Sequence, residues 1–490
     1  MGSNKWFTSE DLKIAFNLFC CVYGIGTLGM PANFSRAGPL LAVIAMLFMA
    51  FANVYASVVC SKVMLIAPRS VKTFGDLGEW CMGKTGRWLV VISQMGVCLL
   101  VPCAFLVLGG ILLSSLFPGA FQDKTWIVLM AISAIPVCVT PTMKEGAGAA
   151  FAGCLGTIIA DVIGVAVLMH GMSGHPSVPS SNVSFEQVAL TFGNLSLAYG
   201  AGIVIPALQR QHSEPSRMPR VIGVTLTFIS VLFLVLASTG YSAVGCQISG
   251  NLLFTIVANA ETGLTKLGFS SDRGAVVLAY LFMQLHISIA FAVILHPAFY
   301  IFERMCLGMH KKKPDDVECQ AYATISTPAI GTMQDEVRKS KNSVVSMADI
   351  EKEHDNEEDE AAEYKGYELR YIPMRLSVMA LLALASVLLK DHFLDLTDFV
   401  GASAISVSCI TLPIVFYFKK MWTSIPIWEK CAGAIVIAVC LVLGTYVTIK
   451  TGKNLFNPDP ADPNAPNFPF CHEEFQYNVY YNATAAALGL

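Results

Sequence analysis

The chain has 490 residues, of which 54% are hydrophobic and only 14% are charged, whereas an average soluble domain has roughly 25% charged residues. This composition excludes a soluble enzyme and a disordered chain, and a net charge of −3 offers no general positive field to hold a nucleic acid. The 15 cysteines amount to about 3% of the chain, below the level that marks a disulfide scaffold.

A helix that spans a membrane needs about 20 apolar residues, and eleven runs of this kind follow one another along the chain. They are too long and too continuously apolar for the alternating strands of a barrel. We therefore expect an all-α integral membrane protein with about 11 transmembrane helices. The runs lie at residues 12–34, 38–66, 87–117, 124–141, 148–171, 186–208, 218–243, 273–303, 372–390, 394–418 and 427–449.

The distribution of Lys and Arg predicts the orientation of these helices. With the N-terminus in the cytoplasm, 25 of the 32 basic residues fall on the cytoplasmic side, as the positive-inside rule requires. An odd number of helices then places the C-terminus outside or in a lumen, together with the glycosylation sequons at Asn182 and Asn482. We expect a multi-pass protein of the plasma membrane or of a vacuolar or endosomal membrane.

The charge distribution divides the chain into four parts: helices 1–8 (1–306), an acidic loop (307–370), helices 9–11 (371–450) and a Pro-rich outer tail (451–490). The loop holds 15 of the 35 acids, including the run EKEHDNEEDE at 351–360. Such a segment cannot bury a core, and we expect it to be disordered in the cytoplasm. It is either an inert spacer or the contact site of a regulatory partner.

The first apolar run contains Tyr23-Gly24-Ile-Gly26-Thr-Leu-Gly29. The three glycines match the spacing of a dinucleotide-binding loop, but no strand precedes them and no acid follows until Asp76, far beyond the roughly 20 residues that such a site requires.

A second copy of the pattern favours a different interpretation. The sequence repeats as Tyr199-Gly200-Ala-Gly202, followed by Pro206. Because this copy lies five helices after the first one, the two helices run in opposite directions. Paired Gly/Pro interruptions in corresponding helices indicate a transporter binding site, because the freed N–H groups suit a carboxylate and the freed carbonyls suit an ammonium group. Glycines that only permit close helix packing are the alternative. The predicted substrate-binding residues are Tyr23, Gly24, Ile25, Gly26, Thr27, Ala198, Tyr199, Gly200 and Gly202.

The chain resembles the amino acid/auxin permease family over most of its membrane portion. The resemblance rests on the order of several segments, namely GIGTLGMPANFSRAG, TFGDLGEWCMGKTGRWLV, LAYGAGIVIPALQRQHSEPSRMPRVI and GYSAVGCQISGNLL. It implies a five-plus-five inverted-repeat fold with discontinuous helices 1 and 6, and secondary active transport of amino acids, commonly proton-coupled and sometimes sodium-coupled. Gly202 stands where many members have His, and the 307–370 loop is longer than is typical.

Other polar residues within the runs are candidates for coupling or for lining a cavity. Asp161 is an acid at membrane depth, which makes it a candidate for proton coupling. His286 is a second candidate, at a position that resembles a His of plant-type members; both could instead be structural. Gln94, Gln284 and Ser288 could line the cavity or form ordinary interhelical hydrogen bonds.

Cys246 and Cys471 both fall on the outer side and are either a disulfide or two free thiols.

The sequence thus predicts a secondary active amino acid transporter, with protons favoured as the driving ion and sodium as the alternative. We expect no cofactor and no metal site; the partners are the amino acid and the lipid bilayer, with no nucleic acid. The alternatives are an amino acid sensor that signals through the 307–370 loop, and an auxin-like or other organic acid carrier. An intramembrane enzyme would need paired acids or a His cluster at membrane depth. Asp161 alone does not make such a pair, so we do not expect an enzyme.

Overall fold

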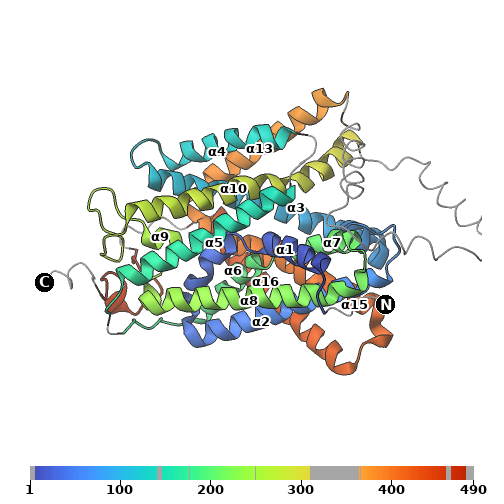
Figure 1. Ribbon diagram of the computed structural model, residues 1–490, viewed down its shortest axis with the longest axis horizontal. Helices are drawn as coiled ribbons and strands as arrows, with labels where there is room; N and C mark the ends of the chain where they lie inside the picture. Colours follow the sequence, from blue (N-terminus) through green and yellow to red (C-terminus); the bar gives the residue numbers. More distant parts are fainter. Residues whose placement is uncertain are drawn as a thin grey trace, which may run out of the picture.

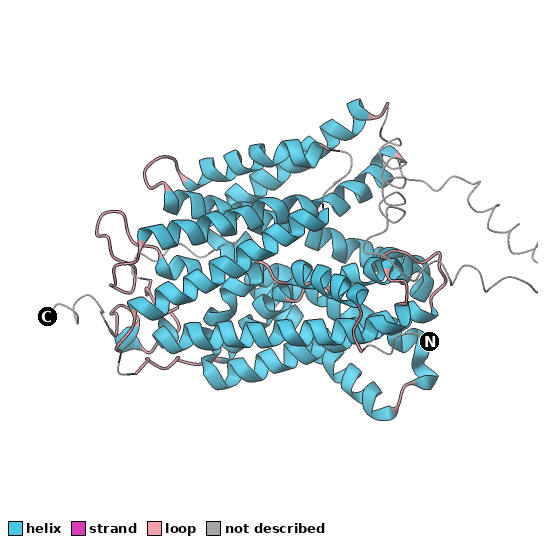
Figure 2. Ribbon diagram, in the orientation of Figure 1, coloured by secondary structure: helices cyan, strands magenta, loops and turns pink. Residues whose placement is uncertain are grey.

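The computed structural model describes residues 6–140, 146–175, 177–248, 250–309, 364, 366–458 and 465–481. Helices packed along a common direction make up nearly all of this part of the chain (Figure 1), and short loops connect them (Figure 2). The acidic run at 351–360 and the sequon at Asn482 lie outside the described residues.

In the described residues each of the eleven predicted runs is mostly helical, and the first and sixth also contain non-helical residues. The longer helices are α1 (Ser9–Val22), α2 (Met30–Ile66), α3 (Phe74–Leu116), α4 (Asp123–Val139), α5 (Gly146–Gly171), α6 (Phe185–Ala198), α8 (Met218–Val244), α10 (Arg273–Phe302), α13 (Glu368–Leu388) and α16 (Ile427–Phe456). The shorter ones are α7 (Ile205–Gln211), α9 (Leu252–Ile256), α14 (Phe393–Val400), α15 (Leu412–Met421), the 3₁₀-helices η1 (Ile25–Gly29) and η2 (Gly202–Val204), and the π-helices η5 (Glu303–Leu307) and η7 (Gly401–Thr411).

Within the described residues, nine helical stretches are long and apolar enough to cross a membrane by length and composition. The two predicted runs outside this set have simple explanations. The first run is divided between α1 and the stretch Ile25–Ile66, and α4 has only 17 residues.

Two glycines bend long helices. Gly38 has φ 71° and precedes Pro39, so α2 contains both the end of the first predicted span and the whole of the second. Gly83 has φ 68° and separates the start of α3 from its membrane-spanning part. Positive φ is readily available only to glycine, and the proline cannot donate the hydrogen bond that would continue the helix.

The side chains on the outside of the helices are apolar. Ile44, Leu47 and Phe51 of α2 are 54%, 60% and 51% exposed, and Ile427 at the start of α16 is 78% exposed. Exposed apolar surface on this scale is the surface that lipid covers. The exposed residues therefore agree with the membrane assignment made from composition.

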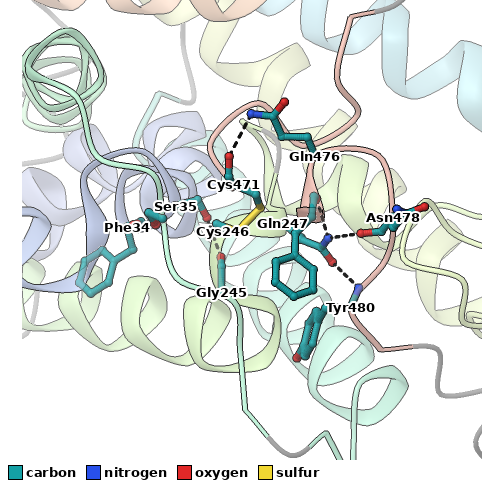
Figure 3. Close-up of a disulfide and its surroundings, with 11 residues drawn as sticks. Phe34, Ser35, Gly245, Cys246, Gln247, Cys471, Gln476, Asn478 and Tyr480 are labelled. Carbon is teal, nitrogen blue, oxygen red and sulfur yellow. Dashed lines mark hydrogen bonds between the residues drawn. A yellow bond between two sulfur atoms is a disulfide. The ribbon is translucent and has the colours of Figure 1, made fainter. Parts of the chain in front are cut away.

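Cys246 and Cys471 form a disulfide that joins residues 225 positions apart, which decides between the two alternatives left open by the sequence. Figure 3 shows the tail held beside it, where the Gln247 amide donates to the carbonyl of Asn478 at 2.8 Å. The described tail, residues 465–481, lies at the opposite end of the helices from the start of α1 (Figure 1). Disulfides persist in oxidising compartments, in agreement with an outer or lumenal position for this end.

Candidate functional site

The first helix is interrupted where the glycines predict it. α1 ends at Val22, Tyr23 and Gly24 have extended backbones, and the chain continues as the 3₁₀-helix η1. Glycine costs a helix about 1 kcal/mol relative to alanine, and Pro31 in the first turn of α2 cannot donate a backbone hydrogen bond. The predicted interruption at residues 23–27 is therefore confirmed.

The sixth predicted helix is interrupted at the matching place. α6 ends at Ala198, a turn follows through Tyr199, Gly200 and Ala201, and η2 leads into α7. Pro206 lies in the first turn of α7, where its missing N–H costs nothing. Residues 199–203 are not continuous α-helix, as predicted.

The two interruptions touch each other. A Cβ atom added to Gly26 would lie 2.7 Å from Ala198 Cα, and one added to Gly202 would lie 2.7 Å from Cys409 Cα in η7. Because real side chains do not tolerate such distances, the glycines permit close helix packing in addition to interrupting the helices. The packing alternative therefore holds alongside the predicted interruption.

A cavity of about 210 Å³ lies beside both interruptions. Four of the nine predicted substrate-binding residues line it, namely Gly24, Ile25, Gly26 and Gly200. The other walls come from α1, α3, α5, α10 and η7, and include Cys20, Val97, Val101, Phe105, Gly153, His286, Ile289, Val293 and Ile405.

The other five predicted residues are not among those that line the cavity, and their contact with a substrate stays a prediction. The rings of Tyr23 and Tyr199 pack on Phe233 of α8, with centroids 5.9 Å and 5.2 Å away, and the Tyr199 hydroxyl donates to Ser230 at 2.7 Å. Ala198 packs against Gly26, and Gly202 packs against Cys409. Thr27 is fully buried on the side of Asp161.

His286 lies in the cavity wall with a defined orientation. Its Nδ1 is 3.1 Å from the carbonyl oxygen of Gly153, and because a carbonyl only accepts, Nδ1 carries the proton. In the neutral ring, Nε2 is then an acceptor, and a Cβ atom on Gly24 would lie 3.1 Å from it. His286 thus presents an acceptor to the first interruption.

Asp161 lies behind the first interruption. Asp161 is 2% exposed, and the side chains of Thr27 and Tyr23 are the hydroxyl groups placed to act on its carboxyl group. Among the described residues, no ion pair joins Asp161 to a Lys, Arg or His. Burial of an ionised carboxylate without a counter-charge is costly, which keeps Asp161 a candidate for coupling.

The three cavity-lining candidates lie outside the central cavity. Gln94 of α3 lines a second cavity nearer the end where α1 begins. Gln284 Nε2 lies 3.1 Å from Met130 Sδ of α4, and the Ser288 hydroxyl donates to the carbonyl of Gln284. Their spacing on one face of α10 is as expected, but that face turns away from the two interruptions.

At the end of the molecule that carries the disulfide, the helices around the site are joined by polar contacts that sequence reasoning missed. Arg36 Nη1 lies 2.8 Å from Asp398 Oδ2 of α14, and the Asn33 amide donates to Asn194 Oδ1 of α6 at 2.9 Å. All four side chains are buried. Asn33 and Arg36 follow the glycines of the first interruption closely, which was the sequence signal that could have drawn attention to them. Their partners could not be found in this way, because they lie more than 160 residues away in the chain.

A second buried network ties α1 to the α7–α8 connection at the opposite end. Asp11 is 1% exposed, with its Oδ1 2.9 Å from His212 Nε2 and its Oδ2 2.6 Å from Arg217 Nη2. Burial by itself would raise the pKa of Asp11, but hydrogen bonds from Arg217, the Thr8 backbone and His212 outweigh it and hold that pKa well below its usual range. The network therefore keeps an ionised Asp11.

Comparisons with known proteins agree with this geometry. Residues 8–452 match the family described as "Transmembrane amino acid transporter protein". The chain belongs to this transmembrane amino acid transporter family. It is 21% identical over 468 residues to the Arabidopsis thaliana amino acid transporter ANT1, a match that covers 90% of this chain and 92% of ANT1.

Two further comparisons concern a second relative and the fold. The chain is 26% identical to the Arabidopsis thaliana amino acid transporter AVT1I, a match that covers 50% of this chain and 61% of AVT1I's length. A mutant of the Eremococcus coleocola manganese transporter has the same fold, with a TM-score of 0.54, 12% identity, and coverage of 94% of this chain and 91% of that protein. The expected inverted-repeat transporter fold is confirmed.

Proposed function

We propose that the chain is a secondary active, proton-coupled transporter of amino acids, which works by alternating access around the interruptions of its first and sixth predicted helices. The observation that supports this most is the central cavity itself. It lies beside both interruptions, and about 210 Å³ is the volume of a single amino acid rather than of a larger metabolite.

The backbone at the interruptions suits both ends of a zwitterion. The N–H groups at the start of η1, near Ile25 and Gly26, are placed to receive a carboxylate. The carbonyls of the last turn of α1, near Val22, and Nε2 of His286 are acceptors for an ammonium group. An organic acid that lacks an amino group would leave the acceptors without a partner.

The cavity walls favour a neutral amino acid with an apolar side chain. No Asp, Glu, Lys or Arg is among the lining residues, and α3, α10 and η7 contribute Val101, Phe105, Val293 and Ile405. A charged side chain would lose its hydration without gaining an ion pair there. We therefore expect Leu-, Met- or Phe-like substrates rather than acidic or basic ones.

Asp161 is the proposed proton carrier, with His286 as a second candidate. The carboxyl group of Asp161 lies beside Thr27 of η1 and Tyr23, so a movement of the first helix changes its surroundings. The protonation of Asp161 would therefore depend on the conformation of the substrate site, and the conformation would depend on the protonation. Sodium bound by the same oxygens is the alternative.

The test is uptake of a labelled amino acid panel by proteoliposomes that contain the purified full-length chain. Proton and sodium gradients are imposed separately, and counterflow is measured without a gradient. We expect counterflow of apolar amino acids and accumulation with the proton gradient alone. Binding without counterflow would instead support the amino acid sensor, and accumulation of an organic acid without an amino group would support the organic acid carrier.

A further inference from the structure

A second cavity, of about 800 Å³, opens at the predicted cytoplasmic end of the molecule. It lies between the α2–α3 connection, the first turns of the membrane-spanning part of α3, and the end of α10. Its lining holds three cationic side chains and one carboxylate. Lys72 comes from the connection, Asp76 and Arg87 come from α3, and Arg304 comes from η5.

The second cavity continues the central one along the same helix faces. Pro297 of α10 lines both cavities. On α3, the residues that line the second cavity are followed at intervals of three or four by those that line the central one, which places them on one face. In order they are Arg87, Val91, Gln94, Cys98, Val101 and Phe105.

The lipid-facing side of α3 lies elsewhere. Leu89 and Ile92 are 42% and 65% exposed, and the helical period of 3.6 residues puts them roughly opposite Gln94. Trp88 of α3 and Met305 of η5, 54% and 58% exposed, form the rim of the second cavity. Beyond this rim, the Gln94 face of α3 leads from the second cavity towards the central one.

The charge of the second cavity is only partly neutralised. Arg87 forms an ion pair with Glu79, and Oδ2 of Asp76 accepts the backbone N–H of Thr73 at 3.2 Å. Lys72 and Arg304 form no ion pair with any residue in the described ranges. A cleft with such a lining concentrates anions, whereas the central cavity has no cationic side chain.

We propose that the second cavity is a transient binding site for the carboxylate of the amino acid as it passes between the cytoplasm and the central cavity, with Lys72 and Arg304 as the binding groups. The proposal rests on the transport function proposed above. The cationic site offers the carboxylate a counter-charge until it reaches the N–H groups of η1, and it raises the local concentration of substrate on the cytoplasmic side only.

The structure favours substrate over the other anionic ligand of such sites, the headgroup of an acidic phospholipid. A headgroup would enter past the exposed rim at Trp88 and Met305, whereas Val91 and Gln94 line the part of the cavity that leads to the central one. Binding of a lipid headgroup would also not require the second cavity to lead to the central cavity, whereas passage of substrate does.

The test compares Lys72→Gln and Arg304→Gln with wild type in right-side-out and inside-out vesicles. Lys84→Gln is the matched control, because Lys84 is exposed on the same part of α3 and outside the cavity lining. We expect the half-saturating concentration for cytoplasmic substrate to rise about three- to tenfold in each cavity variant. The value for the other face, and both values in Lys84→Gln, should stay unchanged.

Two further measurements test whether the positive charge itself causes the change. Lys72→Arg should restore the cytoplasmic value, and 0.5 M salt should reduce the difference between wild type and Lys72→Gln, because salt screens exposed charges. Equal shifts on both faces, or none, would overturn the proposal. A change only in the response to vesicles with phosphoinositides would show a lipid site instead. If wild type itself transports nothing, the proposed function fails and this inference with it.

Discussion

Arg36 and Asp398 form a buried ion pair between the helices that follow and precede the central cavity, with 2.8 Å between Nη1 and Oδ2. Arg36 follows the first interruption by about two turns, and Asp398 lies in α14, just before the π-helix η7 that lines the central cavity. In the alternating-access mechanism proposed above, opening of this predicted outer end would require the two groups to separate. We therefore expect the pair to favour the conformation that is closed on this side.

We expect Asp398→Asn to weaken the outer closure strongly, since removing one member of a buried pair leaves an uncompensated charge and costs about 3–5 kcal/mol. Hydrogen exchange at residues 30–37 and 393–400 should become faster, and uptake should fall. The double variant Arg36→Met/Asp398→Leu removes both charges and should slow the exchange again. Unchanged exchange in Asp398→Asn would show that the pair does not hold this end.

Gly26→Ala should reduce uptake at least tenfold, because the new Cβ atom would press on the backbone of Ala198 and push the two interruptions apart. Gly223→Ala in α8 is the control, since its nearest neighbour would lie at an ordinary 3.7 Å. Initial uptake rates are to be normalised to the amount of protein at the membrane. Equal rates in the two variants would contradict the tight contact.

Asp161→Asn should abolish accumulation driven by a proton gradient and leave counterflow without a gradient in place. The amide fills the same space but cannot gain and lose the proton. Thr157→Val, one turn away on the same helix, is the control because its hydroxyl donates only to the carbonyl of Gly153 at 3.2 Å. Proton-driven accumulation that survives in Asp161→Asn would remove this residue from the coupling mechanism.

The Asp11 carboxylate should stay ionised over the physiological pH range. The lowered pKa of Asp11 means that its stabilisation is present above the unfolded-state value of about 3.9 and is lost only as pH falls through the lower folded-state value. In His212→Gln, which removes the histidine of the network, hydrogen exchange of α1 at pH 5 and pH 8, corrected for the intrinsic rates, should therefore agree.

Asp11→Asn should release α1 and speed its exchange at both pH values. Glu10→Gln is the control: Glu10 is a more exposed neighbour that contacts the backbone and side chain of Ser213, and its replacement should have a much smaller effect. A large difference between pH 5 and pH 8 in His212→Gln would contradict a lowered pKa of Asp11.

The sequence by itself determined the membrane class, the helical segments and the two interruptions. Hydropathy over about 20 residues and the positions of Gly and Pro are local properties, and a helix in lipid has to satisfy its own backbone. For this reason Tyr23-Gly24 and Tyr199-Gly200 could be located as interruptions without knowing the fold.

Only the tertiary structure decided which side chains meet. Tyr23, Thr27 and Tyr199 turned away from the central cavity because helix rotation depends on neighbours such as Phe233, and Gln284 turned towards Met130. The pairs Arg36–Asp398, Asp11–His212 and Cys246–Cys471 join residues more than 200 positions apart. Local patterns carry no record of such partners, because they are brought together only when the helices pack.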